Sequence, residues 1–260
     1  MILCLLYVLN TLINLSHGRQ IFTVNEITQE LSGMRRIGQS FWTIGDSNTG
    51  SYIGKTNLTS MVQEKITIKG IKNQDWEALI SDSKNHIWIL DTGDNKKKRK
   101  FLSLYEIDPT HIKETAITPV RKIQLIYSSP ESRRKNIEAG IYKDGFLYLF
   151  EKTKKGSKKK PDLFRINLKS NSSKTQLLKK ISELPPLSEI TDAAYFNNQI
   201  YLLTYQGIFK CISDKKNFCS SYQKVNSSQH NQQESLIVLD RYFWIGNEDG
   251  AIFEEIRETP

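Results

Sequence analysis

The stretch NQDWEALISDSKNHIWILDTGDN, residues 73–95, decides the fold of this chain. It begins with a Trp-Glu pair, continues through small and apolar residues, turns at SDSKN and returns as the aromatic and aliphatic segment IWIL. Two short apolar runs separated by a polar turn are typical of an antiparallel β-hairpin. If such a hairpin recurs at a regular interval, it predicts a repeat fold rather than an isolated site.

Four other stretches follow the same order of residue types. Each opens with an acidic residue, continues with small or apolar residues, turns at a polar segment and returns as an aromatic-rich strand. The opening acids of the five stretches are Glu30, Glu77, Glu138, Asp192 and Glu234. Their successive separations of 47, 61, 54 and 42 residues are those of a repeat built from several short strands.

Two more strand-like segments follow each hairpin in most of the units, such as SYIGKTN and KITIKG in the first. Four antiparallel strands per unit, repeated radially, form the blade of a β-propeller. The fifth unit lacks its last strand, and QIFTV at residues 20–24 precedes the first acid just as KITIKG precedes the second. The sequence therefore predicts an all-β, five-bladed β-propeller closed by its N-terminal strand, since closure removes an open sheet edge. A six-bladed propeller is the alternative.

The combined order of these motifs resembles a family of secreted bacterial β-propeller proteins. The matching segments are ELSG with FWTIGDSNTG, NQDWEALI with IWILDTGDNKKKR, IEAGIYKDGFLYLFEK, and ITDAAY, and the match as a whole covers roughly Glu30 to Phe253. The resemblance implies fold and location but no activity. The chain departs from the family pattern at residues 46–50, DSNTG, where Asp-Ser-Gly is expected, and at Ala78, where a second acid is usual. WD40 proteins are a looser comparison, because their Gly-His and Trp-Asp signals are absent.

The N-terminal segment indicates export. Residues 1–16, MILCLLYVLNTLINLS, form an apolar run without an acid or a base. This run predicts a cleaved signal peptide over residues 1–18 rather than a membrane anchor, because it is short for a span and contains Asn10 and Asn14. We therefore expect residues 19–260 to form a single propeller domain, secreted or periplasmic, with no transmembrane span after signal removal.

Two cysteines, Cys211 and Cys219, flank a polar loop between strand-like stretches. In an oxidising compartment we expect them to form a disulfide rather than to remain free thiols. The formal net charge of +9 is concentrated in lysine clumps at residues 96–100, 154–155 and 158–160, each between strands. Such clumps are usually solvated loops, and here they could also form a rim that attracts anions.

Propeller geometry predicts where polar residues gather. In each blade the inner strand starts at one face and runs along the central channel, and the second strand returns to that face. The opening acids should therefore meet the loops that end the second strands. The expected ligand-binding residues at this face are Glu77, Glu138, Asp91, Asp94, Asn95 and Arg99.

Five carboxylates around one axis would repel one another, by roughly 2–3 kcal/mol per pair at about 6 Å and an effective dielectric near 20. A hard cation would offset this repulsion, and Ca²⁺ suits carboxylate and amide oxygens. Raised pKa values, or hydrogen bonds from backbone N–H groups of the next blade, would also do so. The candidate metal ligands are Glu30, Glu77, Glu138, Asp192 and Glu234. A structural role is expected for most of the five, and a ligand-facing role for Glu77 and Glu138.

Three functions remain open at this point, and the sequence favours the first. The first is a monomeric binding or scaffold module with an axial site for a small-molecule or protein ligand. The second is a Ca²⁺-dependent hydrolase, similar to propeller phosphoesterases or lactonases, whose cation polarises a small anionic substrate and activates water. The third is electrostatic attachment to an acidic polymer through the lysine-rich loops. The chain carries no serine-hydrolase motif and no nucleic-acid-binding motif, so neither of those activities is expected.

Overall fold

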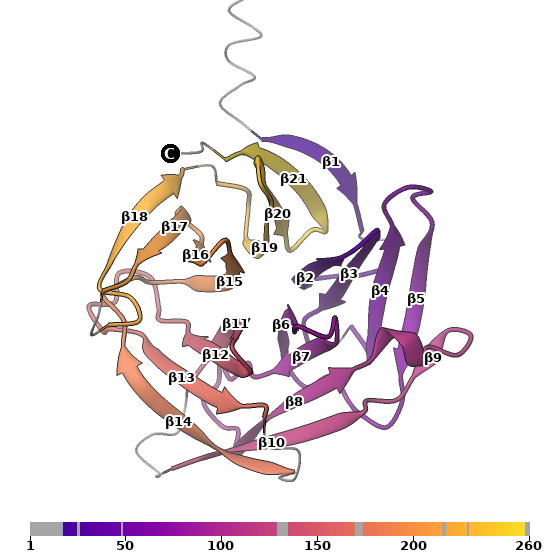
Figure 1. Cartoon of the computed structure of the whole chain (residues 1–260), viewed down its shortest axis with the longest axis horizontal. Helices are drawn as coiled ribbons and strands as arrows, with labels where there is room; N and C mark the ends of the chain where they lie inside the picture. Colours follow the sequence, from indigo (N-terminus) through magenta and orange to yellow (C-terminus); the bar gives the residue numbers. More distant parts are fainter. Residues whose placement is uncertain are drawn as a thin grey trace, which may run out of the picture.

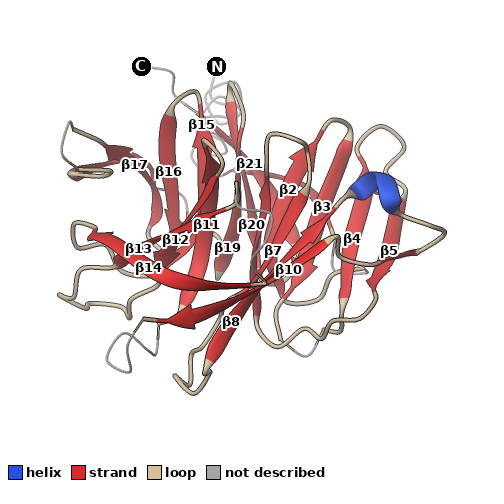
Figure 2. Ribbon diagram, turned by 60° about the horizontal axis from the view of Figure 1, so that its bottom comes forward, coloured by secondary structure: helices blue, strands red, loops and turns tan. Residues whose placement is uncertain are grey.

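In the part of the chain that the structure describes, sheets of four, eight, four and five strands surround a common axis, and they contain five units of four antiparallel strands (Figure 1). The structure is a computed structural model that describes residues 18–24, 27–47, 49–128, 135–169, 174–214, 217–227 and 229–257. The expected signal peptide, 1–18, lies outside the described residues apart from Gly18. Figure 2 shows that strands dominate the fold and that its one described helical segment is a single short turn. Among the described residues, no helix has the length and apolar character to cross a membrane.

We number the five units as blades 1 to 5 in the order in which their inner strands occur in the chain. From the axis outward, blade 1 consists of β2 (Leu31–Ile37), β3 (Ser40–Gly45), β4 (Tyr52–Asn57) and β5 (Gln63–Ile68), and blade 2 consists of β6 (Trp76–Ser81), β7 (Ile87–Asp91), β8 (Phe101–Ile107) and β10 (Arg121–Tyr127). Blade 3 consists of β11 (Ile137–Lys143), β12 (Phe146–Glu151), β13 (Asp162–Asn167) and β14 (Thr175–Glu183), and blade 4 consists of β15 (Ile190–Phe196), β16 (Gln199–Thr204), β17 (Gly207–Ile212) and β18 (Ser221–Asn226). Blade 5 consists of β19 (Gln233–Val238), β20 (Tyr242–Asn247), β21 (Ala251–Ile256) and β1 (Arg19–Thr23).

The N-terminal strand completes the last blade, as the sequence predicts. Strand β1 pairs antiparallel with β21, from Arg19 opposite Glu254 to Thr23 opposite Ala251 (Figure 1). The first and last described strands of the chain are thus hydrogen-bonded in one sheet, and the ring is closed without an open edge at its seam.

The hydrophobic core is divided into five clusters, and each lies between two neighbouring blades. Between blades 1 and 2, for example, Trp42 and Ile44 pack with Trp76 and Ile89. The cluster that closes the ring joins blades 5 and 1 and includes Ile252. Because both faces of each blade are covered by its neighbours, the strands contain apolar runs such as IWIL rather than strict alternation.

An irregularity of register near the start of each inner strand sets the direction of one side chain. The shift falls at Ser32 in β2, Glu77 in β6, Glu138 in β11, Thr191 in β15 and Glu234 in β19. A β-bulge leaves one residue outside the ladder and re-aims its side chain. The three glutamates line the axial pocket described below, whereas the two hydroxyls donate hydrogen bonds to backbone carbonyls of the next blade.

Two strand pairings connect blades at their outer edges. Strand β10 pairs in parallel with β14, which joins blades 2 and 3 into one eight-stranded sheet. Between β8 and β10 the chain forms the 3₁₀ turn η1 (Pro109–His111) and strand β9 (Ala116–Ile117), which pairs in parallel with β5 of blade 1. Blade 2 is therefore tied to both of its neighbours.

The predicted disulfide is present. Cys211 on β17 is bonded to Cys219, and their Cα atoms lie 5.4 Å apart. Both side chains are buried in the cluster between blades 3 and 4, so the disulfide fixes the loop that leads into β18 against the core.

Candidate functional site

An acidic pocket of about 190 Å³ lies on the axis, at the face where the inner strands begin. Bulged inner strands supply three of its carboxylates and the ends of second strands supply two, and these are the two kinds of position that propeller geometry predicts. Its carboxylates are Glu30, Asp46, Glu77, Glu138, Glu234 and Glu248, and the single cationic side chain among its described lining residues is Lys152. The excess of negative charge makes this pocket a candidate cation site.

Three acids at one side of the pocket lie close enough to share an ion. Asp46 follows β3, Asp75 precedes β6, and Glu77 occupies the bulge of β6. One oxygen from each lies within 4.8 Å of the other two. Glu77 is 6% exposed, and among the described residues its carboxylate makes no hydrogen bond or ion pair. No oxygen of Glu77 is among the enclosed polar atoms that lack a hydrogen bond, so the carboxylate faces the pocket, where its closeness to other acids calls for a counter-charge.

The backbone makes room for these carboxylates at Gly93. A Cβ atom on this residue would lie 2.0 Å from Oε1 of Glu77 and 2.5 Å from Cγ of Asp75. Any side chain at this position would therefore displace the two acids. The two acids thus explain why the DTGDN loop has glycine, a residue without a side chain, at this position.

The acids of the pocket hold protons more tightly than usual. Burial, reinforced by the charge of Asp46, raises the pKa of Asp75 to about 7. Burial and the neighbouring charges of Glu138, Asp46 and Asp75 raise the pKa of Glu77 well above its ordinary value. Without a cation, some of these groups are thus protonated near neutral pH.

The opposite side of the pocket is organised around Lys152, which follows β12. Its ammonium group forms an ion pair with Glu138 and donates to the hydroxyl of Tyr205 at 3.1 Å. Tyr205 in turn donates to Glu234. Burial lowers the pKa of Lys152, but the charges of Glu138 and Glu234 outweigh this and raise it overall, so the lysine stays charged.

A hydrogen-bonded chain links this side to the loop after β7. The amide group of Asn136 donates to Glu138 at 2.6 Å and to Asn95 at 2.9 Å. The side-chain oxygen of Asn136 accepts from the backbone N–H of Asp94 at 2.8 Å. Asn95 consequently lies at the pocket, as expected.

The other residues of this loop that were expected to bind ligand, Asp91, Asp94 and Arg99, form contacts that hold the loop in place. The buried carboxylate of Asp91 is paired with Arg99 at 2.8 Å. Arg99 also donates to the carbonyl of Gly93 at 2.9 Å. The carboxylate of Asp94 accepts the backbone N–H groups of Lys98 and Arg99 at 2.7 and 3.2 Å. These three side chains are therefore engaged in holding the loop.

Of the five opening acids, Asp192 lies outside the pocket, and Glu30 lies at the pocket but not at a bulge. Asp192 is fully buried away from the pocket, where Arg35 of blade 1 binds it with both guanidinium N–H₂ groups at 2.9 and 3.1 Å. It follows the bulged residue of its strand by one position, and a shift of one residue turns a side chain to the other side of a strand. Glu30 precedes the bulge in β2 by two positions and is exposed at the mouth of the pocket. The five acids therefore do not form one symmetric ring.

Three residues of the site are missed by sequence reasoning that looks only for acids at strand starts. Lys152 and Tyr205 directly follow second strands, so the geometric rule places them at this face. Asp75 precedes Trp76 in the stretch that decides the fold. The signal for all three is their position in the blade, not their charge.

A second, wider pocket of about 770 Å³ adjoins the three acids. Asp46, Asp75 and Asn95 line it together with basic residues. Its described basic residues are Lys72, Lys96, Lys98 and Arg99. A cation held by the acids would face these basic groups across the pocket, an arrangement suited to an anionic ligand.

The ring of blades around a polar axial face defines this chain as a β-propeller protein. Neither a scan against protein-family models nor a search of curated proteins found a match. Among solved structures, the chain is similar to one in a nidogen/laminin complex, with 9% identity, a TM-score of 0.51 and coverage of 84% of this chain and 72% of that chain. It is also similar to luciferin-regenerating enzyme, with 8% identity, a TM-score of 0.50 and coverage of 91% and 78%.

Two further similar structures have TM-scores below 0.5, and this chain spans two thirds or less of each of them. The chain spans 66% of virginiamycin B lyase from Staphylococcus aureus, at 11% identity and a TM-score of 0.47. It spans 28% of the extracellular domain of BT4673 from B. thetaiotaomicron, at 14% identity and a TM-score of 0.41. At these identities the comparisons show the β-propeller fold and nothing about activity.

Proposed function

We propose that this chain is an exported binding β-propeller that holds Ca²⁺ at Asp46, Asp75 and Glu77 and presents it to a small anionic ligand. The observation that carries the proposal is the carboxylate of Glu77, which lines the pocket close to Asp46 and Asp75 and makes no hydrogen bond or ion pair to a described residue. Ca²⁺ prefers oxygen ligands in flexible geometry, and carboxylates at this spacing supply them.

A cation satisfies these acids better than protons do near neutral pH. The pKa of Asp75, raised by burial and by Asp46 to about 7, means that a proton occupies this group only about half of the time at that pH. A divalent ion would replace the proton and remove the repulsion among all three acids. Cation binding is therefore expected to release protons.

The anionic character of the ligand follows from the wider pocket. Its volume of about 770 Å³ is in the range of small-molecule sites, roughly 300–1,000 Å³. Lys72, Lys96 and Lys98 lie at its rim. An anion bound there would contact the cation on one side and ammonium groups on the other, and the two contacts together would define its position.

Export is supported by three observations. Cys211 and Cys219 form a disulfide, which is typical of oxidising compartments. The motif order resembles secreted bacterial propellers, and the apolar segment 1–16 has the character of a signal peptide.

The experiment is calorimetric titration of the metal-free chain with Ca²⁺ and with Mg²⁺. The wild type is expected to bind one Ca²⁺ more tightly than Mg²⁺, and Glu77→Gln is expected to lose this binding. The matched control is Glu64→Gln, since Glu64 is half exposed on β5 and paired only with Lys55. Inorganic phosphate is then titrated with and without Ca²⁺. Equal Ca²⁺ affinity in wild type and Glu77→Gln would refute the proposed cation site. A phosphate affinity that is the same with and without Ca²⁺ would refute the proposal that the ion helps to bind an anionic ligand.

Hydrolysis is the second candidate function, and one observation favours it. The carboxyl of Asp75, with its pKa raised by burial and by Asp46 to about 7, has the proton affinity of a general base next to the cation position. In this second candidate Asp75 acts as the general base and is not a Ca²⁺ ligand, so Asp75→Asn would abolish activity while Ca²⁺ and ligand binding remain. Turnover of a panel of phosphoesters and lactones, with Ca²⁺ and with EDTA, tests this function, and activity that survives EDTA would contradict it.

A further inference from the structure

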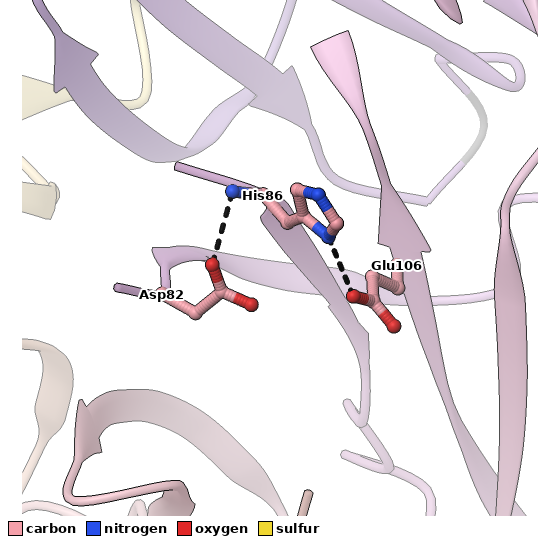
Figure 3. Close-up of side chains that lie close together, drawn as sticks. All are labelled: Asp82, His86 and Glu106. Atoms are coloured by element: carbon pink, nitrogen blue, oxygen red, sulfur yellow. Dashed lines mark hydrogen bonds and ion pairs between the residues drawn. The ribbon is translucent and has the colours of Figure 1, made fainter. Parts of the chain in front are cut away.

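A second polar cluster lies at the other end of blade 2, away from the acidic pocket. His86 is in the turn between β6 and β7, at the opposite end of β6 from Glu77. Glu106 lies near the end of β8, directly across from Trp88 in the ladder. Figure 3 shows Asp82 accepting the backbone N–H of His86, and Glu106 lying against the imidazole ring. Nothing in the proposed function uses these residues.

Glu106 determines which nitrogen of His86 is free. Its Oε1 lies 2.7 Å from Nδ1 of the imidazole (Figure 3). Its other oxygen accepts from Nε of Arg121 at 2.7 Å. Both oxygens of Glu106 are thus engaged, and a neutral His86 carries its proton on Nδ1. A carboxylate that orients a histidine in this way is the usual outer partner of a metal-binding imidazole.

The free Nε2 of His86 faces a carboxylate that a second histidine also approaches. Nε2 of His86 and Nε2 of His111 each lie 3.5 Å from Oδ2 of Asp108. This separation is long for a hydrogen bond between such groups. It is close to the distance between neighbouring ligand atoms around tetrahedral Zn²⁺, about 3.3 Å for bonds of about 2.0–2.1 Å.

The oxygens of the nearby acids are otherwise occupied, with one exception. Oδ1 of Asp108 accepts from the backbone N–H and the hydroxyl of Thr110 at 3.0 and 2.6 Å. Asp82 accepts the backbone N–H groups of Lys84 and His86 on one oxygen and Nε1–H of Trp88 on the other. Oδ2 of Asp108 is therefore the carboxylate oxygen available to an ion.

We propose that His86, Asp108 and His111 bind a divalent transition metal ion of the Zn²⁺ class, with Glu106 as a positioning residue. His86 is 20% exposed, and His111 is 62% exposed on η1. The ligand atoms of His86, Asp108 and His111 do not all lie within 4.8 Å of one another, so the exposed imidazole of His111 must rotate toward His86 to complete the site. Three protein ligands leave a fourth position for water, as in open zinc sites.

The ligand types distinguish this site from the axial one. Imidazole nitrogens favour Zn²⁺ and other borderline ions, whereas a set of carboxylates favours Ca²⁺. The acids behind the cluster add attraction: an oxygen of Asp82 and one of Glu106 lie within 4.8 Å of a ring nitrogen of His86. The inference goes beyond the proposed function and does not depend on it.

The test uses Co²⁺ as a visible probe and Zn²⁺ as its competitor on the chain purified without a histidine tag. We expect one Co²⁺ per chain with the strong absorption of a tetrahedral centre, and stoichiometric displacement by Zn²⁺. His111→Gln should weaken binding at least tenfold without changing thermal stability, because its side chain is exposed. Glu106→Gln should weaken binding about 10- to 100-fold while leaving one metal per chain.

The matched control is His230→Gln. His230 also pairs with a carboxylate, Glu255, at 2.8 Å, but no second histidine approaches it in the described part of the chain. This variant should bind Co²⁺ as the wild type does. Absence of a tetrahedral Co²⁺ spectrum in the wild type, or an unchanged spectrum and affinity in both His86→Gln and His111→Gln, would overturn the proposal. Because His111 is exposed, loss of folding cannot account for the result with that variant.

Discussion

Replacing Glu77 with glutamine is expected to stabilise the metal-free protein while abolishing its response to Ca²⁺. Most substitutions of buried residues destabilise a fold. Here the native side chain is a buried acid without a hydrogen bond or ion pair among the described residues. The amide is nearly the same size and carries no charge, so it removes the repulsion and keeps the packing. The predicted effect has the opposite sign to that of an ordinary core substitution.

The magnitude follows from the geometry of the three acids. At 4.8 Å, the upper limit of their mutual separations, two unit charges repel by about 3.5 kcal/mol at an effective dielectric of about 20. The protein can avoid this cost by keeping Glu77 protonated. At about pH 8, holding a proton on a group whose ordinary pKa is 4.5 costs up to about 5 kcal/mol. We expect glutamine to recover about 2 kcal/mol of this, which corresponds to a rise in Tm of about 4 °C or more.

The assay is thermal unfolding in EDTA and in excess Ca²⁺, for the wild type, Glu77→Gln and the control Glu64→Gln. Ca²⁺ at about one hundred times its dissociation constant should stabilise the wild type and the control by about 2.7 kcal/mol. Glu77→Gln should melt higher than the wild type in EDTA and should not respond to Ca²⁺. A variant that melts lower than the wild type in EDTA, or that keeps the full Ca²⁺ shift, would refute the reasoning.

Three further predictions concern other parts of the axis. Burial raises the pKa of Glu234 to about 8, so between about pH 4.5 and 8 the native state binds more protons than the unfolded state. The unfolding free energy of the metal-free protein should therefore fall over this range by up to about 1.4 kcal/mol per pH unit. Urea titrations at several pH values should show a smaller pH slope for Glu234→Gln. Arg35→Met leaves the buried charge of Asp192 unpaired and should cost about 3–5 kcal/mol of unfolding free energy, and a loss below about 1 kcal/mol would contradict this. Gly93→Ala places a Cβ 2.0 Å from an oxygen of Glu77 and should weaken Ca²⁺ binding at least tenfold by calorimetry, whereas unchanged affinity would mean that these acids do not bind the ion.

The blades could be predicted from the sequence because each is a local unit. Four strands of a blade follow one another along the chain, and polar turns such as SDSKN and KDG separate them. The closing strand β1 could also be predicted, because the fifth unit of the sequence lacks its fourth strand and QIFTV at the N-terminus can supply it. The parallel pairing of β10 with β14 could not be predicted. It joins outer strands of different blades, and only the three-dimensional arrangement brings them together.

The site was predicted only in part because its register depends on bulges. The rule that strand starts meet second-strand ends placed Glu77, Glu138 and Glu234 at the axis. Aligning the units by their acids placed Asp192 there too, but the bulge of its strand falls one residue earlier, at Thr191. A bulge has no fixed residue type: in this chain it is a glutamate in three units and a hydroxyl residue, Ser32 or Thr191, in the other two. The register of those two strands therefore cannot be read from the acids alone. The error of one residue sends Asp192 to a buried ion pair instead.

The two proposed metal sites lie at opposite ends of the same strands, and this arrangement predicts that they act independently. Strand β6 has six residues, which span roughly 20 Å. That distance exceeds the Debye length of about 8 Å at physiological ionic strength. Effects at sites farther apart than about 10 Å usually add within about 0.5 kcal/mol.

The double variant Glu77→Gln with His111→Gln should therefore show the sum of the two single effects in melts with Ca²⁺ and Zn²⁺. Ca²⁺ affinity should likewise be the same with and without Zn²⁺. If β6 instead moved as a rigid element between two positions, each ion would change the affinity of the other, and by thermodynamic linkage by the same factor. A common factor of tenfold or more in both titrations would thus reject independence and identify β6 as the coupling element.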